Sequence, residues 1–87
     1  MKRTTITAGI SAGREERTIA ELVQLANRFS SSIHLETENK IINAKSIMGM
    51  MTMAFVSGEQ MDVIAEGADE AEALKTAIEL IESGLGE

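Results

Sequence analysis

The segment from Arg14 to Phe29 constrains the fold most strongly, because its apolar residues recur at the spacing of a single helix face. Those residues are Ile19, Leu22, Val23, Ala26 and Phe29. Acidic residues gather near the start of the segment, where negative charge suits the positive end of a helix dipole. A helix with one apolar face has to bury that face against another layer, so the segment predicts a layered domain.

A second helix of the same kind is predicted to begin at Asp69 and to stop at Gly84. Asp69 is a suitable acidic N-cap, and Glu72 stands at the third helical position, as in a capping box. The apolar face of this helix comprises Ala73, Leu74, Ala77, Ile78 and Ile81. Two one-sided helices require a shared apolar surface on which to pack.

Four short segments have the β-branched composition or the apolar–polar alternation of strands, and turn residues bound them. They are Thr4–Ala8, Ile33–Thr37, Lys40–Asn43 and Gln60–Glu66. With a hairpin turn at Glu38-Asn39 and a short helix after Ser46, the element order is βαββαβα. The predicted class is α+β, a four-stranded antiparallel sheet with helices packed on one face. We expect one domain that spans residues 1–87.

The charge of the chain argues against direct nucleic-acid binding. Fourteen acidic and eight basic residues give a net charge of −6, and two Phe with no Trp or Tyr leave little to stack on bases. An acidic domain is steered towards basic patches on protein partners. With no Cys and no run near the roughly 20 apolar residues of a membrane span, we expect a cytoplasmic protein that makes no membrane contact.

Catalytic and metal-binding motifs are not found. The single histidine, His34, alternates with Ile33 and Leu35 and is therefore predicted on the sheet face opposite the core. The chain has no Cys/His cluster of metal-ligand spacing and no glycine-rich phosphate loop. We therefore predict a protein that is not an enzyme and that holds no metal or cofactor.

Ser46 precedes a short apolar helix, and two interpretations of it are open. A serine at this position can cap free backbone N–H groups, and the same helix end tolerates a phosphate. On the residues alone, capping is favoured because N-cap serines are common.

The turn after Ser46 is unusually rich in methionine and likewise allows two interpretations. The apolar residues Ile47, Met48, Met50, Met51 and Met53 exceed what one short turn can bury. They either fill the core or form a surface on which flexible thioethers adapt to a partner. We expect Ile47, Met48 and Met51 to be the exposed ones, since they lie one helical turn apart.

Two strings, together with the element order, resemble the HPr phosphocarrier family of the sugar phosphotransferase system (PTS). They are Leu22-Val23-Gln24 with Ala26-Asn27-Arg28-Phe29, and Asn43-Ala44-Lys45-Ser46-Ile47-Met48-Gly49-Met50-Met51. The resemblance spans nearly the whole chain and is closest to the catabolite-repression HPr-like (Crh-like) paralogues of Gram-positive bacteria. It implies the open-faced sandwich of the HPr family.

The resemblance breaks at the phosphoryl-accepting histidine. In the family, a histidine at the start of the first helix carries the phosphoryl group, and an arginine and a proline follow it. By position these residues fall on Glu15, Arg17 and Thr18, so the arginine alone is kept. A carboxylate forms only a labile acyl phosphate. The resemblance therefore demotes a PTS phosphocarrier role to the alternative function. Glu15 itself is a solvated acid, a residue left by loss of function, or a weak imitation of phosphohistidine.

The family's regulatory serine falls on Ser46, and its apolar recognition surface falls on Ile47, Met48 and Met51. The resemblance thus implies phosphorylation by HPr kinase/phosphorylase and a corepressor role with a LacI-type catabolite control regulator. It adds Arg17 to the partner-binding residues, although Glu15 and Glu16 carry charge that can occupy its guanidinium.

Two further expectations concern partners. PTS enzymes are additional candidate partners, and an exposed first strand would permit a homodimer. A diverged interaction domain with neither activity is the third functional hypothesis.

Overall fold

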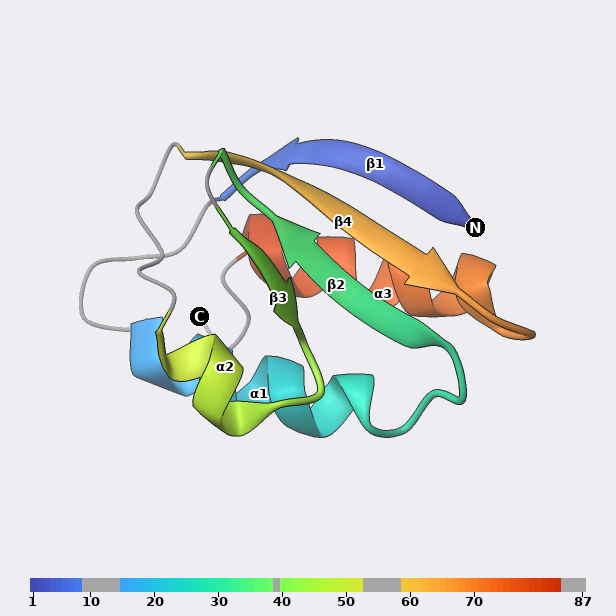
Figure 1. Ribbon diagram of the computed structural model, residues 1–87, viewed down its shortest axis with the longest axis horizontal. Coiled ribbons are helices and arrows are strands. Elements are labelled where there is room, and N and C mark those ends of the chain that lie inside the picture. The colour runs from blue at the N-terminus through green and yellow to red at the C-terminus, as the bar shows by residue number, and fades with distance from the viewer. Residues whose placement is uncertain (9–14, 39, 53–58, 84–87) are drawn as a thin grey trace.

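The computed structural model describes residues 1–8, 15–38, 40–52 and 59–83 and confirms the predicted class and element order (Figure 1). A four-stranded antiparallel sheet and three helices make up these residues. The elements in chain order are β1 (Lys2–Thr7), α1 (Glu15–Ala26), β2 (Ser32–Glu36), β3 (Ile41–Asn43), α2 (Ile47–Met51), β4 (Gln60–Glu66) and α3 (Glu70–Ser83).

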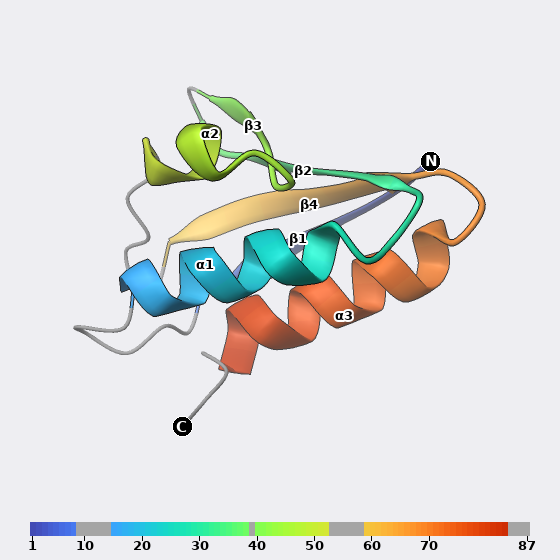
Figure 2. The ribbon, with the colours of Figure 1, turned by 90° about the horizontal axis from the view of Figure 1, so that it is seen from below.

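The last strand lies inside the sheet, whose order is β1-β4-β2-β3. β4 pairs antiparallel with β1 and with β2, so that Val63 is opposite Thr4 on one side and Leu35 on the other. The helices α1 and α3 lie together against one face of the sheet (Figure 2). The opposite face is left open by the described residues, as in an open-faced sandwich.

The core lies between the sheet and the two long helices, as the alternation and the helical spacing predict. Leu22 from α1 and Ile81 from α3 are fully buried, as are Ile33 and Leu35 from β2. The alternation in β4 buries Met61, Val63 and Ala65 on this same side.

The first helix is shorter than predicted. It ends at Ala26, and Phe29 lies in a following turn in which its backbone N–H bonds to the carbonyl of Ala26. Phe29 still packs against the core. Apolar periodicity therefore continued past the end of the helix, because a turn can present a side chain to the same core.

Asp69 holds the N-cap position of α3, but its side chain does not do what a capping box predicts. Its carbonyl accepts the first helical bond from Ala73, whereas its carboxylate accepts bonds from the backbone and hydroxyl groups of Ser30 and Ser31. The hydrogen bond from the Ser31 hydroxyl is the main reason that the pKa of Asp69 is lowered from 3.8 to about 2. Asp69 thus fastens the loop after α1 to the start of α3.

Gly67 makes this junction possible. Its φ of +147° lies in a region that L side chains rarely adopt, and a Cβ built there would lie 2.6 Å from the Ser31 Oγ and 2.7 Å from the Ser31 Cα. Ser31 itself is fully buried. The turn between β4 and α3 therefore needs a residue without a side chain at position 67.

Candidate functional site

Ser46 is the N-cap of α2, as the sequence predicts. Its backbone is extended, with φ −101° and ψ 113°, and its Oγ accepts a bond of 3.1 Å from the backbone N–H of Gly49. Its carbonyl accepts the first helical bond from Met50 at 2.9 Å. The hydroxyl oxygen is the acceptor in this cap, so the hydroxyl proton takes no part in it.

The segment before Ser46 is fastened to the end of α1. The Lys45 ammonium donates to the carbonyl of Phe29 at 2.8 Å, and the Asn27 amide donates to the carbonyl of Lys45 at 3.3 Å. Asn43 closes the turn locally, because its side-chain oxygen accepts from the N–H of Lys45 at 2.9 Å. The position of Ser46 is therefore set by contacts with the turn after α1 as well as by its own helix.

The methionine-rich turn divides between the two predicted roles. Met50 is fully buried and fills the core, whereas Ile47, Met48 and Met51 are 45%, 78% and 71% exposed. The predicted exposure of these three side chains is confirmed, and Met53 lies outside the described residues. We refer to Ile47, Met48 and Met51 as the apolar patch. The single buried residue Met50 anchors α2 to the core, so the patch is presented by a fixed element.

Gly49 keeps the space beside the Ser46 hydroxyl open. A Cβ at this position would lie 3.3 Å from the Ser46 Oγ and 3.6 Å from a methyl group of Ile42. Such contacts are tight but not forbidding, since side-chain atoms can shift by a few tenths of an ångström.

The start of α1 carries the position that the family resemblance assigns to the phosphoryl-accepting histidine. Glu15 is the first residue of this helix, and its side chain lies outside the description. Arg17 is exposed, and its Nε donates to the Glu21 carboxylate at 3.2 Å. Within the described side chains, the ion pair of this guanidinium is with Glu21, one turn further along the helix, and the side chains of Glu15 and Glu16 lie outside the described part. Thr18 is buried, and within the described part of the chain its hydroxyl has no hydrogen-bond partner.

The arrangement of helices brings these features to one end of the molecule. α2 packs against α1, and both ribbon views place the C-terminal end of α2 towards the first turn of α1 (Figures 1 and 2). The C-terminal end of α2 and the first turn of α1 therefore lie at the same end of the molecule, and Ser46 caps the other end of the short helix.

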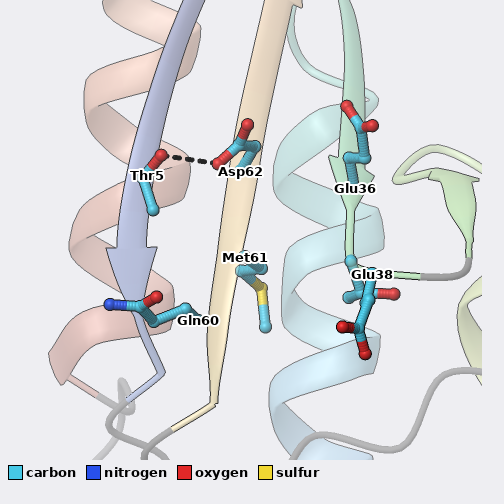
Figure 3. A pocket seen from close by; sticks show the side chains of 7 residues that line it. Thr5, Glu36, Glu38, Gln60, Met61 and Asp62 are labelled. Carbon is cyan, nitrogen blue, oxygen red and sulfur yellow. Dashed lines mark hydrogen bonds between the residues drawn. The ribbon is translucent and has the colours of Figure 1, made fainter.

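The open face of the sheet offers a different kind of surface. A hollow of about 210 Å³ is lined mainly by polar residues of β1, β2 and β4 and by Glu38 (Figure 3). Two of its carboxylates are already paired, because the Arg3 guanidinium bonds to Glu36 at 2.8 Å and to Asp62 at 2.6 Å. Hydrogen bonds from Thr5 and then Arg3 lower the pKa of Asp62.

His34 lies on the outward face of β2, as predicted, where it is half-buried between its cross-strand neighbours Asn43 and Ile64. Within the ranges that the structure describes, no three His, Cys, Asp or Glu residues are grouped as a metal site requires. None of the helices in those ranges combines the length and the apolar character that crossing a membrane demands.

Comparison with known proteins gives a family match over most of the chain. A family model described as the PTS HPr component phosphorylation site matches residues 2–83. The HPr-like protein Crh of Halalkalibacterium halodurans is 47% identical over 73 residues, which cover 84% of this chain and 87% of that protein. The phosphocarrier protein HPr of Treponema pallidum is also 47% identical, over 68 residues that cover 78% of this chain and 76% of that protein.

Solved structures show the same fold. An HPr from Thermoanaerobacter tengcongensis superposes with a TM-score of 0.90 at 46% identity and covers 100% of this chain and 98% of its own. Crh of Bacillus subtilis, described as a dimer with a swapped domain, superposes with a TM-score of 0.73 at 39% identity and covers 94% of this chain and 90% of its own.

Proposed function

This chain belongs to the HPr family of the PTS, and we propose that it is a non-enzymatic regulator that HPr kinase/phosphorylase phosphorylates on Ser46. In this proposal the phosphorylated protein acts as corepressor for a LacI-type catabolite control regulator. The observation that carries the proposal is the pairing of a helix-capping serine with three exposed apolar side chains on the same helix.

The charge distribution around Ser46 supports recognition by a partner. A phosphate would add roughly 1.5 to 2 negative charges at a helix start, where such charge is favoured by under about 1 kcal/mol, so little refolding is expected. The nearby Lys45 already donates to the carbonyl of Phe29, and Lys40 donates to the carbonyl of Thr52. Each of these ammonium groups already holds a backbone carbonyl, and in this proposal basic residues of a partner bind the phosphate.

The apolar patch supplies the second half of the recognition surface. Partners that bury Met48 and Met51 gain the transfer free energy of two long side chains that α2 already holds in place. Since Met50 and the cap fix this helix before binding, little ordering of the backbone is needed.

A phosphocarrier role in sugar uptake is the second candidate function. It is supported by the 47% identity to the Treponema pallidum HPr, which equals the identity to the Halalkalibacterium halodurans Crh. Position 15 counts against it. Glu15 opens α1 where the family resemblance puts the phosphoryl-accepting histidine. A carboxylate lacks the imidazole nitrogen that accepts and donates the phosphoryl group.

One experiment separates the two functions. The protein is incubated with HPr kinase/phosphorylase and ATP, and separately with enzyme I and phosphoenolpyruvate, and the phosphate is located by mass spectrometry. We expect label on Ser46 in the first reaction only. A Ser46→Ala variant is the negative control, and a Glu15→His variant tests whether enzyme I recognises this scaffold.

Other outcomes decide against the proposal. Acid-labile, base-stable label on wild-type protein in the second reaction would support the phosphocarrier. Absence of label in both reactions would leave an interaction domain with neither activity. Binding of the Ser46-phosphorylated protein to the regulator, measured by calorimetry, then tests the corepressor step.

Arg17 offers a finer test of the regulator interface. Removing charge beside it with Glu15→Ala, or breaking its ion pair with Glu21→Gln, should free the guanidinium for a partner. An exposed pair of this kind is worth about 0.3 to 0.5 kcal/mol, so the gain in affinity should be about twofold. Unchanged or weaker binding at several salt concentrations would count against this gain in affinity.

The self-association of this chain is a separate question. Among the described strands β1 is at an edge of the sheet and pairs with β4 alone, and Crh of Bacillus subtilis is described as a dimer with a swapped domain. We therefore propose a homodimer as a further partner state. Sizing by light scattering over a concentration series tests it, and a concentration-independent monomer mass would refute it.

A further inference from the structure

Among the described residues, the exposed methionine side chains other than that of Met1 lie on α2. The chain has six methionines and no cysteine, so thioethers are its only sulfur groups. Among the described residues, Met48 and Met51 are 78% and 71% exposed, whereas Met50 and Met61 are at most 2% exposed. Met1 is also exposed but precedes β1, and its amine lies 3.2 Å from Glu70 at the start of α3.

We propose that Met48 and Met51 are a site of reversible oxidation by peroxide, and that their oxidation switches off docking at the apolar patch. This inference rests on the proposed function of that patch. The reaction is balanced with hydrogen peroxide as the named oxidant. The thioether sulfur attacks one peroxide oxygen, the O–O bond breaks, the sulfur becomes a sulfoxide, and the peroxide is reduced to water. A methionine sulfoxide reductase reverses the step at the expense of two thiols, which form a disulfide.

Oxidation would change the surface of α2 while leaving its attachment intact. The helix is held by the Ser46 cap, by Thr52 at its C-terminal end and by the buried Met50, and none of these groups is an exposed thioether. On α2, the sulfur atoms that a peroxide reaches first therefore belong to the docking surface and not to the core. Because the reactive thioethers and the groups that hold the helix in place are different residues of α2, oxidation can change binding without unfolding the helix.

The effect on binding follows from the polarity of the sulfoxide. A patch of one isoleucine and two thioethers is apolar, whereas a sulfoxide oxygen is a strong hydrogen-bond acceptor that loses its water when a partner covers it. Burial of a polar group without a compensating bond weakens binding, and for one such group we expect about a tenfold loss of affinity. Two sulfoxides on the same patch should weaken it further.

The test uses the full chain phosphorylated on Ser46 and treated with graded hydrogen peroxide. Peptide mass spectrometry should find added oxygen on Met48 and Met51 before Met50 and Met61. The affinity for the LacI-type regulator should fall about tenfold or more as these two residues react, and treatment with methionine sulfoxide reductase and thioredoxin should restore it.

A matched variant isolates the two thioethers. The double substitution Met48→Leu with Met51→Leu keeps two long apolar side chains and removes the reactive sulfur, while every other methionine is retained. Whatever its affinity before treatment, that affinity should not change after peroxide. An equal loss of affinity in the double variant would overturn the proposal, because the effect would then come from another residue.

The remaining outcomes are equally decisive. Oxidation of Met50 or Met61 at the same rate as the exposed pair would overturn the proposed site. Unaltered binding of fully oxidised protein would overturn the switch while leaving the proposed function standing. Failure of the unoxidised phosphoprotein to bind the regulator would refute both, and the two failures are thereby distinguished.

Discussion

Ser31 and Ser46 each lie beside a glycine, but the first pair holds two segments of the chain together and the second leaves a hydroxyl accessible. The hydroxyl of Ser31 is buried and donates to Asp69, and Gly67 approaches it so closely that a Cβ would lie 2.6 Å from its Oγ. The hydroxyl of Ser46 is half-buried and accepts from the backbone, and a Cβ on Gly49 would lie 3.3 Å from it. The first serine is locked by its surroundings, whereas the second keeps open space beside its oxygen.

The difference shows why a hydroxyl near a helix end is not by itself a modification site. At Ser31 the hydroxyl proton, the glycine and the carboxylate form one closed junction between two segments of the chain. At Ser46 the oxygen holds a single backbone bond, and exposed apolar side chains follow it. Five substitutions or conditions test this contrast, and they are ordered from the largest expected effect to the smallest.

Gly67→Ala should have the largest effect on stability. The substitution combines an unfavourable backbone angle with a Cβ that overlaps Ser31, and we expect a loss of about 3 kcal/mol in the free energy of unfolding. Urea denaturation followed by circular dichroism measures it. A loss below about 1 kcal/mol would mean that the two segments separate easily and that the junction is not locked.

Ser31→Ala should have the next largest effect. It removes a buried hydroxyl that donates to a carboxylate, and we expect a loss of about 2 kcal/mol. The same denaturation experiment applies, with Ser30→Ala as the matched control because Ser30 is exposed and its hydroxyl bond to Asp69 is longer, at 3.3 Å. Equal losses in the two variants would contradict a special role for Ser31.

The pH dependence of stability tests the same junction through Asp69. Its pKa is lowered from 3.8 to about 2 in the folded protein, so its contribution is complete above about pH 4 and is lost as the pH falls towards 2. The difference in melting temperature between wild-type protein and Ser31→Ala should therefore narrow between pH 5 and pH 2. The variant is needed because hydrogen bonds also lower the pKa values of Asp62 and Glu70. A constant difference in melting temperature across this range would show that the lowered pKa of Asp69 does not depend on Ser31.

Ser46→Ala should reduce stability less than Ser31→Ala does and should abolish phosphorylation. Loss of an N-cap costs about 1 kcal/mol, which is about half of the loss expected at Ser31. No phosphate should be incorporated by HPr kinase/phosphorylase and ATP. The variant separates folding from modification because circular dichroism reports the first and mass spectrometry the second, and residual label would place the acceptor elsewhere.

Gly49→Ala should have the smallest effect on stability. The helix propensity of alanine is offset by crowding against the Ser46 hydroxyl, and we expect a net change within about 0.5 kcal/mol. The rate of phosphorylation should nevertheless fall, because the added methyl group narrows access to the Ser46 oxygen. An unchanged rate of phosphorylation would show that the open space beside Ser46 is not what distinguishes it from Ser31.

Sequence reasoning predicted the local features of this fold well, because they depend on residues close together in the chain. Helical spacing identified the faces of α1 and α3, and alternation identified β4 with its bounds. The Ser46 cap followed from a contact that spans three residues. The predicted helix end at Phe29 was wrong, and the helix ends at Ala26, because the apolar spacing that continues to Phe29 reports burial, which a turn also provides.

Contacts between distant segments were beyond local patterns. The partners of the Asp69 carboxylate lie 38 and 39 residues away, and the lysine that fastens the Ser46 segment to the turn after α1 reaches 16 residues back. A capping box was the natural expectation at Asp69, since it needs only neighbouring residues. The significance of Glu15 and Ser46 came from family resemblance, because neither spacing nor charge distinguishes them from ordinary helix-start residues.

The ion pairs of Arg3 bear on how quickly β1 can leave the sheet. The guanidinium of Arg3, on β1, bonds to Asp62 of the neighbouring strand β4 and to Glu36 of β2, so it links three strands. Any exchange of β1 between molecules must first break both contacts, in addition to the backbone bonds to β4. Because exposed charges are screened by salt, this part of the activation barrier shrinks as ionic strength rises. If the proposed homodimer forms by exchange of β1, the rate of that exchange is therefore expected to depend on the ionic strength.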